Sequence, residues 1–162
     1  MIRFASFSDL ERIVEIYNQS ITSGMAVTAD TKEVSVESKV DWFHQHESKK
    51  LPIWVYDIDD VVAGWLSFNT FYDRPAYDAT VELSLYIAAG HQRKGYGRLL
   101  VEEALKTAHS FGVETITAFI FAHNKGSLKL FEAYNFEQWG YLPKVAEIDN
   151  IKRDLVIIGK KV

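Results

Sequence analysis

The sequence predicts an α/β protein that forms one domain, residues 1–162, from a mixed sheet with helices on both faces. Its length of 162 residues lies close to the usual size of a single domain. Strand-like runs form a hairpin pattern in the first half, and strands alternate with helices in the second half. With 48% hydrophobic residues, the chain can bury a core without a disulfide or a metal.

The first part of the chain predicts a short strand at 2–4, followed by a helix. Ser8 and Glu11 have the spacing of a capping box, which begins a helix by satisfying free backbone N–H groups. The apolar positions of this helix recur at helical spacing: Leu10, Ile13, Val14 and Tyr17. A loop is expected at 22–34, and a second amphipathic helix at 36–47.

The central part predicts a hairpin and a long strand. Runs at 53–58 and 61–69 are separated by two aspartates, which is hairpin spacing. A loop follows at 71–78, because Pro75 interrupts strand hydrogen bonding and Asp favours turns. Residues 80–88 alternate most regularly between apolar and polar side chains, so they are expected to form a half-buried strand.

The last part alternates helices with strands. A glycine-bearing loop at 90–97 leads into a helix at 98–111, and Gly112 lies where a left-handed residue would end that helix. The remaining elements are expected to be a strand at 115–121, a helix at 127–134, and strands at 136–141 and 154–158.

Composition excludes several functions. The chain has 18 Lys and Arg against 22 Asp and Glu, and this net charge of -4 argues against duplex nucleic acid as a partner. It contains no cysteine, which excludes disulfides, thiolate zinc sites and cysteine nucleophiles. No run approaches the roughly 18 apolar residues of a membrane span, and the first residues do not resemble a signal peptide. We therefore expect a soluble cytoplasmic protein without a membrane partner.

The histidines do not form a metal site in the predicted arrangement. His44 and His46 are two positions apart on a helix, so their side chains diverge and cannot share an ion. The other histidines are scattered along the chain. We predict that the protein binds no metal.

A basic, glycine-containing loop lies between the 80–88 strand and the next helix. Glycines allow backbone N–H groups to approach an anion, and the following helix adds the positive end of its dipole. Such a nest is suited to a pyrophosphate, although a turn with solvated basic residues is the alternative for a bare Gly-x-Gly. The loop is neither a Walker loop nor a dinucleotide fingerprint. Its sequence is Gln92-Arg93-Lys94-Gly95-Tyr96-Gly97, followed by Arg98.

This pattern, Gln92-x-x-Gly95-x-Gly97, resembles the signature of the GNAT superfamily of acetyl-CoA-dependent N-acetyltransferases. The resemblance extends over essentially the whole chain. Segments 17–18, 27–31 and 71–77 are similar to the phosphinothricin and methionine sulfoximine acetyltransferases in particular. The resemblance implies a GNAT-like, mostly antiparallel sheet with a splayed central strand pair. It also implies a homodimer.

The resemblance also implies how acetyl-CoA, the co-substrate, is bound. Backbone groups of Leu85, Tyr86 and Ile87 would pair with the pantetheine arm, where this strand splays from 118–121. Asn124 would hydrogen-bond the cofactor, although the sequence alone fits a plain turn residue equally well. The loop residues would bind the pyrophosphate: Gln92, Arg93, Lys94, Gly95, Tyr96, Gly97 and Arg98.

Glu82 is the candidate catalytic base. An amine attacks a thioester only after losing its proton, which a nearby carboxylate can accept. Strand alternation places Glu82 off the apolar face of its neighbours, and the resemblance points to the same residue; a solvated or ion-paired carboxylate is the alternative. A backbone N–H near Leu85 is expected to meet the oxyanion. Phe131 stands where many members of the family carry a tyrosine acid, so no general acid is assigned.

The predicted substrate contacts lie in the 71–78 loop. Arg74 is suited to pair with a carboxylate, and Phe71, Tyr72 and Tyr77 would surround the side chain of an amino acid. We therefore expect acetyl transfer to the amine of a small amino-acid-like substrate of the phosphinothricin or methionine sulfoximine type. Because the chain has no cysteine to carry the acetyl group, direct transfer in a ternary complex is favoured.

Two alternatives remain open. In the first, the acceptor is another amine, such as a polyamine, an aminoglycoside or a protein N-terminus. An acidic aromatic pocket would favour this alternative. Otherwise, the protein is a non-catalytic acyl-CoA-binding module. The expected homodimer would use aromatic residues near the C-terminal strands, although these would also suit a core: Phe121, Phe136, Trp139 and Tyr141.

Overall fold

The computed structural model describes residues 1–49 and 51–162. The strands are β1 (Ile2–Phe4), β2 (Ile53–Ile58), β3 (Val61–Thr70), β4 (Thr80–Ile87), β5 (Thr115–Phe121), β6 (Glu137–Ile148) and β7 (Ile151–Lys161). The helices are α1 (Leu10–Thr22), α2 (Val40–Lys49), α3 (Tyr96–Thr107) and α4 (Lys125–Glu132). Short 3₁₀ helices lie at Phe7–Asp9, Glu37–Lys39, Pro75–Tyr77 and Ala108–Phe111.

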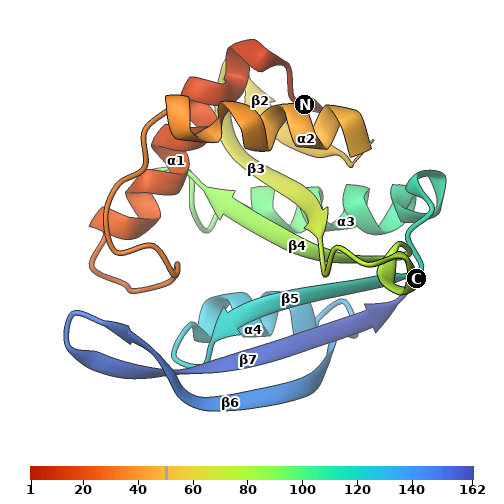
Figure 1. Cartoon of the computed structure of the whole chain (residues 1–162). Coiled ribbons are helices and arrows are strands. Elements are labelled where there is room, and N and C mark those ends of the chain that lie inside the picture. The colour runs from red at the N-terminus through yellow and green to blue at the C-terminus, as the bar shows by residue number, and fades with distance from the viewer. Residues whose placement is uncertain (50) are drawn as a thin grey trace.

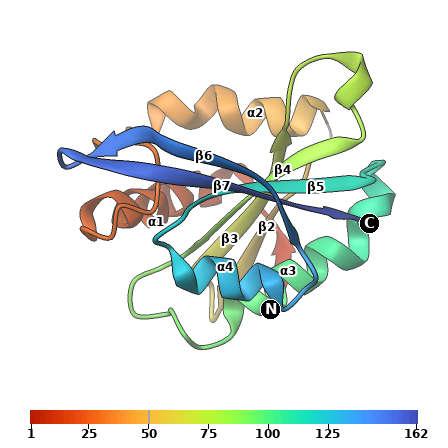
Figure 2. The same ribbon diagram turned by 90° about the horizontal axis from the view of Figure 1, so that it is seen from below.

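The strands form one seven-stranded sheet in the order β1-β2-β3-β4-β5-β7-β6 (Figure 1). Neighbouring strands are antiparallel except β4 and β5, which run parallel. Helices α1 and α2 cover one face of the sheet, and α3 and α4 cover the other (Figure 2). The predicted α/β class, with a mixed and mostly antiparallel sheet between helices, is confirmed.

Alternation along β4 assigns its side chains to the two faces. Val81 and Leu83 are buried in the core that contains α3 and α4. Tyr86, which has the opposite orientation, packs against the core under α1 and α2. Glu82 has the same parity as Tyr86, so it faces the α1 and α2 side. The strand pattern that predicted this element thus also decides where its carboxylate lies.

The splayed central pair is also present. β4 and β5 pair only at their first residues, through Thr80 with Thr115, Val81 with Ile116 and Glu82 with Thr117. Beyond that register the two strands diverge, although β4 continues to Ile87 beside β3 (Figure 1). The β5 side of the second half of β4 is therefore left without a paired strand in the part of the chain that the structure describes.

Boundary predictions were wrong at the start of α1 and in the last two strands. The turn before α1 is closed by Ser6 and Asp9, because the Ser6 N–H donates to the Asp9 carboxylate at 2.7 Å; Ser8 instead contacts the Ser6 hydroxyl at 2.8 Å. Strands β6 and β7 are longer than expected and form a long hairpin. Their ladder is irregular between Leu142 and Ala146, around Pro143, and this interruption concealed the strand in the sequence.

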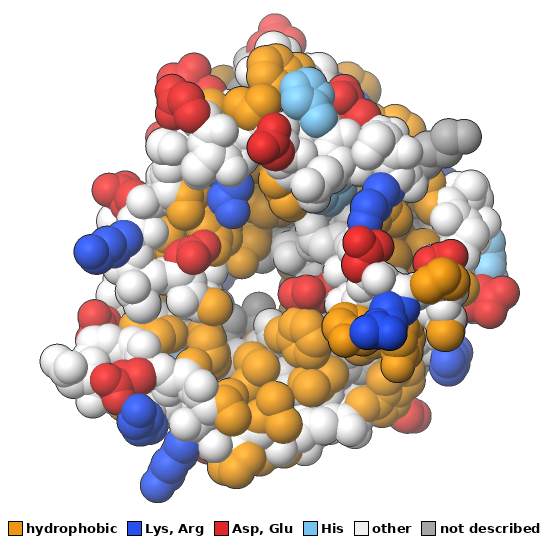
Figure 3. Space-filling model, viewed as in Figure 1, with side chains coloured by type: hydrophobic (Ala, Val, Ile, Leu, Met, Phe, Trp, Pro, Cys, Tyr) orange, Lys and Arg blue, Asp and Glu red, His pale blue; other side chains and the backbone are white. Residues whose placement is uncertain are grey.

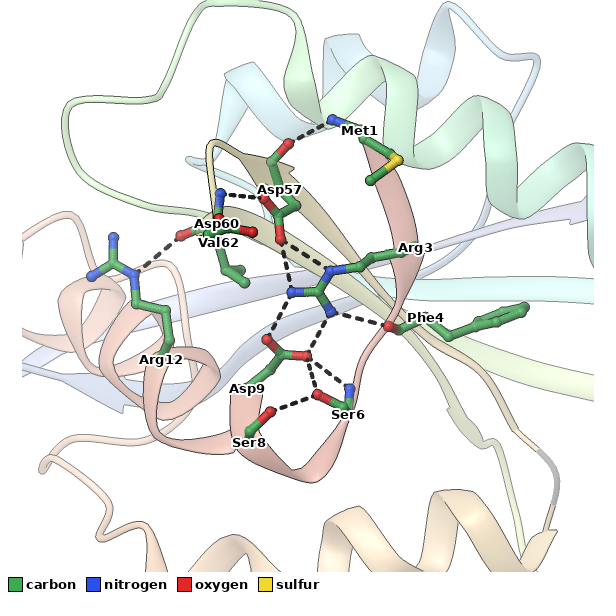
Figure 4. A network of polar contacts seen from close by, with 10 residues as sticks. All are labelled: Met1, Arg3, Phe4, Ser6, Ser8, Asp9, Arg12, Asp57, Asp60 and Val62. Carbon is green, nitrogen blue, oxygen red and sulfur yellow. Dashed lines mark hydrogen bonds and ion pairs between the residues drawn. The ribbon is translucent and has the colours of Figure 1, made fainter.

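A charge cluster joins β1, β2 and the turn before α1 (Figure 4). The Arg3 guanidinium donates to Asp9 at 2.8 and 2.9 Å and to Asp57 at 2.8 and 3.0 Å. These bonds to Arg3 lower the pKa of Asp9 to about 2, although burial acts in the opposite direction. The cluster connects residues 54 positions apart, so its role is to hold the fold together.

The helices of the described residues are too short or too polar to cross a membrane.

Candidate active site

A cavity of about 500 Å³ lies on the face of the sheet covered by α1 and α2. Side chains from α1, α2, β3, β4, β5 and the β6–β7 hairpin line it, together with part of the segment between α1 and α2. In Figure 3 the molecular surface is hollowed between the part that carries α1 and α2 and the part that carries β5, β6 and β7. The volume is sufficient for a small molecule.

Three cross-strand pairs of β3 and β4 contribute the floor of this cavity. Trp65 lies opposite Tyr86, Ser67 opposite Ser84, and Asn69 opposite Glu82. All six line the cavity, since paired residues project from the same face of a sheet. The floor therefore changes along the strands from aromatic, through hydroxyl, to an amide beside a carboxylate.

Asn69 connects this floor to the helix above it. Its Oδ1 accepts from Trp42 Nε1 at 3.3 Å and from the Ser67 hydroxyl at 3.3 Å, and it lies 3.2 Å from His46 Nε2. Its Nδ2 donates to the backbone carbonyl of Glu82 at 3.2 Å and to the Ser84 hydroxyl at 3.1 Å. One side chain thus holds α2 to β4 at the residue that carries the carboxylate.

The Glu82 carboxylate has no hydrogen-bond or ion-pair partner among residues 1–49 and 51–162. Its side chain is half-buried in the cavity floor, and this burial raises the pKa of the carboxyl because the charged form loses water. A carboxylate with a raised pKa holds a proton more readily than one in water. It is therefore suited to accept a proton from a reacting group in the cavity.

Tyr17 of α1 lines the cavity next to Tyr86 of the floor. The Tyr17 hydroxyl donates to Asp30 and accepts from Thr28 at 3.0 Å, and its ring packs edge-on against Tyr86 with centroids 5.1 Å apart. Burial, the largest cause for each, raises the pKa of both tyrosines. Both hydroxyls therefore stay protonated at neutral pH, and the Tyr17 contacts hold the segment after α1 against the helix.

The basic loop leads into α3 as predicted, although the helix begins at Tyr96, two residues earlier than expected. Gly95 has a φ of +87°, which side-chain-bearing residues rarely adopt, and it directly precedes Tyr96, the first residue of α3. The Gln92 amide donates to the carbonyl of Ile87 at 3.4 Å, so the loop is tied to the end of β4. Three exposed cations surround this turn: Arg93, Lys94 and Arg98.

Three predicted cofactor residues also have structural contacts. The Tyr96 ring stacks on Tyr56 with centroids 4.5 Å apart. A Cβ on Gly97 would lie 3.6 Å from the Leu85 side chain, which shows how closely α3 approaches β4. The Asn124 side chain caps α4 by accepting from the Ser127 N–H at 3.3 Å. The capping leaves the Asn124 amide nitrogen as its remaining donor.

The predicted substrate residues lie together, but not in the cavity lining. Tyr77 contacts both Phe71 and Tyr72 with ring centroids 5.7 and 5.6 Å apart, and the Arg74 guanidinium lies 5.7 Å from the centre of the Tyr72 ring. This loop cluster reaches the cavity through Phe119, which lines it and lies 6.4 Å from Phe71.

The structure gives the surroundings of Phe131 and of Tyr134, which follows it by three residues. Phe131 is buried, with its ring 5.1 Å from that of Phe136. The Tyr134 hydroxyl donates to Glu102 of α3 at 2.6 Å.

Sequence reasoning missed several cavity residues: Tyr17, Lys39, Trp42, Ser67, Asn69 and Ser84. A signal for the last three was present, since polar residues recur at alternate positions of two neighbouring apolar strands. The helix residues carried no such signal, because their convergence depends on how α1 and α2 pack on the sheet.

The chain is similar to known acetyltransferases over most of its length. A model described as "Acetyltransferase (GNAT) family" matches residues 10–136. The Bacillus subtilis "Putative phosphinothricin acetyltransferase YwnH" is 47% identical over 99% of this chain and 98% of its own. An L-methionine sulfoximine/L-methionine sulfone acetyltransferase of Salmonella typhimurium is 30% identical over 89% of this chain and 84% of its own.

A solved structure has the same fold with the co-substrate bound. The GNAT superfamily phosphinothricin acetyltransferase of Sinorhizobium meliloti, in complex with AcCoA, superposes with a TM-score of 0.93 at 26% identity. The match covers 100% of this chain and 88% of that chain.

Proposed function

The chain belongs to the acetyltransferase (GNAT) family, and we propose that this acetyl-CoA-dependent N-acetyltransferase modifies the α-amine of a small amino-acid-like substrate. The observation that carries the proposal is the unpaired Glu82 carboxylate, which lies in a cavity beside the point where β4 and β5 separate. Phosphinothricin and methionine sulfoximine are the first acceptors to test, since these compounds appear in the names of the relatives.

The residues around the splay fit acetyl-CoA. Among the described residues no strand pairs with the second half of β4 on its β5 side, and Leu85, Tyr86 and Ile87 would hold the pantetheine arm there. The turn made by Gly95 would present backbone N–H groups to the pyrophosphate, with Arg93, Lys94 and Arg98 around it. Acetyl-CoA supplies the activated acetyl group as a thioester; the protein supplies binding, orientation and proton transfer.

Glu82 is proposed as the general base. At neutral pH most of the acceptor is an ammonium ion, which has no lone pair for attack. Glu82 takes the proton from this group directly or through one water, and its raised pKa makes this transfer more favourable. A backbone N–H near Leu85 stabilises the charge that develops on the acetyl carbonyl oxygen. Coenzyme A leaves as a thiolate without a protein acid, consistent with the burial of Phe131.

The acceptor enters from the side of the 71–78 loop in this proposal. Phe71, Tyr72 and Tyr77 contact its outer part, and Arg74 pairs with an anionic group at the cavity mouth. Acetyl-CoA and acceptor are bound together, so transfer occurs in a ternary complex. A cytoplasmic location and the absence of a metal remain predictions.

A homodimer is also part of the proposal. Trp139 and Tyr141 of β6 are 44% and 47% exposed, and hydrophobic side chains gather over β5, β6 and β7 in Figure 3. Phe121 and Phe136, which the sequence also suggested for an interface, are instead buried in the cores. The interface would therefore use the outer part of the β6–β7 hairpin.

A thiol-release assay tests the proposed function. The protein has no cysteine, so every thiol detected with acetyl-CoA present comes from coenzyme A. Methionine sulfoximine and phosphinothricin should release thiol well above the background rate, whereas spermidine, kanamycin and a peptide with a free N-terminus should not. Turnover only with a polyamine, aminoglycoside or peptide would contradict the acceptor class. Binding of acetyl-CoA without turnover on any amine would favour the non-catalytic module.

A further inference from the structure

The wall of the 500 Å³ cavity carries two charged side chains of opposite sign. Among the lining residues that the structure describes, Glu82 is the one carboxylate and Lys39 is the one cation. We propose that the Lys39 ammonium binds the α-carboxylate of the acceptor, so that the cavity recognises an α-amino acid as a zwitterion. This inference rests on the proposed function and names a recognition residue that the sequence analysis did not identify.

Lys39 is held at the wall without being neutralised. It lies directly before α2, is half-buried, and places its Nζ 5.4 Å from the centre of the Tyr17 ring. This contact restrains the ammonium against an aromatic face. No hydrogen bond or ion pair engages the Lys39 ammonium within residues 1–49 and 51–162, so the N–H groups of its side chain remain available for a ligand.

Other cations near the cavity are differently placed. Arg74 lies over the exposed Tyr72 ring outside the lining, and Lys49 pairs with Asp73 at 3.1 Å. Asp30 accepts the Tyr17 hydroxyl and does not ion-pair with Lys39. Lys39 is thus the positive charge that faces the cavity interior, whereas Arg74 can serve an anionic group at the mouth.

The two charges come from different sides of the cavity. Glu82 belongs to the floor formed by β4, and Lys39 belongs to the α2 side above it. An α-amino acid carries its ammonium and carboxylate on the same carbon, so binding the carboxylate to Lys39 orients the amine toward the floor. A polyamine or aminoglycoside would instead place a cation beside Lys39, which disfavours polycationic acceptors.

Paired acceptors test this assignment. An amino acid that the wild-type protein acetylates is compared with its own carboxamide, which keeps the amine and side chain but lacks the anion. Lys39→Met should raise KM for the acid roughly 10- to 100-fold, the usual worth of a hydrogen bond to a charged group. It should change KM for the carboxamide and for acetyl-CoA less than about twofold. Lys39→Arg keeps the positive charge and should retain the preference for the acid.

A matched control and three other results complete the test. Lys32→Met removes an exposed lysine outside the lining and should leave both acceptors unaffected. Equal effects of Lys39→Met on acid and carboxamide would overturn the inference, as would loss of the acid preference in Arg74→Met but not in Lys39→Met. Wild-type protein that acetylates polyamines but no amino acid would overturn the proposed function first, and this inference with it.

Discussion

Two partly buried carboxylates, Asp9 and Glu82, have opposite environments in this protein. Asp9 accepts from Arg3 and from the backbone and hydroxyl of Ser6, and these bonds lower its pKa to about 2. Glu82 accepts from no described residue, and burial alone raises its pKa. Burial disfavours the charged form in both, so the partner decides the direction. One carboxylate is therefore suited to hold structure, and the other to take up a proton.

The largest expected effect is the loss of the unpaired carboxylate. Glu82→Gln keeps the shape of the side chain but cannot accept the proton of the acceptor amine. We expect kcat to fall roughly 10²- to 10⁴-fold, with KM for acetyl-CoA unchanged. Steady-state thiol release across pH 6–9 measures both constants. An undiminished kcat over that range would remove Glu82 from the role of base.

Removing the cation that pairs with Asp9 and Asp57 should lower stability and leave kcat nearly unchanged. Arg3→Met leaves Asp9 and Asp57 together without their cation, in a partly buried position. We expect the free energy of unfolding to fall by about 2–3 kcal/mol. Urea denaturation measures this loss, and kcat of the folded variant should stay within twofold of wild type. A large loss of kcat without a loss of stability would show that the cluster is not purely structural.

Lowering the pH should change the contributions of Asp9 and Glu82 to stability in opposite directions. The pKa of Asp9 is lowered from 3.8 to about 2, so its stabilising contribution of about 2 kcal/mol is complete above pH 3.8 and is lost as pH falls toward 2. The pKa of Glu82 is raised above 4.5, so its ionisation destabilises the fold as pH rises through and above 4.5.

Two variants measure this difference by urea denaturation between pH 3 and 7. Asp9→Asn should be less stable than wild type at pH 7, with the gap closing on acidification. Glu82→Gln should gain stability relative to wild type as pH rises. The same sign for both variants would mean that the environments of Asp9 and Glu82 are not opposite.

The smallest expected effect concerns Asn69, which positions the unpaired carboxylate. Asn69→Ala removes the bonds from its amide to the Glu82 carbonyl and the Ser84 hydroxyl. We expect kcat to fall roughly three- to tenfold, because one or two ordinary hydrogen bonds hold this part of β4. His44→Ala, at an exposed position of the same helix as Trp42 and His46, is the control and should leave kcat unchanged. An Asn69→Ala enzyme with wild-type kcat would exclude a positioning role.

Part of the fold was predictable because its signals are local. Strand alternation from Thr80 onward located β4 and its Glu82 side chain, and Gly112 ends its helix with a φ of 71° as expected. Other elements were mistaken where a local signal was ambiguous. Ser8 and Glu11 match a capping box as well as Ser6 and Asp9 do, and only the bonds of Asp9 to Arg3 and Ser6 distinguish the pairs.

The sequence by itself determined the layered α/β class, the glycine-bearing basic loop before α3 and the residue that carries the candidate base. Each of these depends on neighbours within a few positions, which share a strand face or a turn. The tertiary structure decided that Glu82 has no partner among the described residues, that Asn69 links its strand to α2, and that Lys39 lines the same cavity. Those relations join residues far apart in the chain, and they follow from strand register and helix packing, which no local pattern specifies.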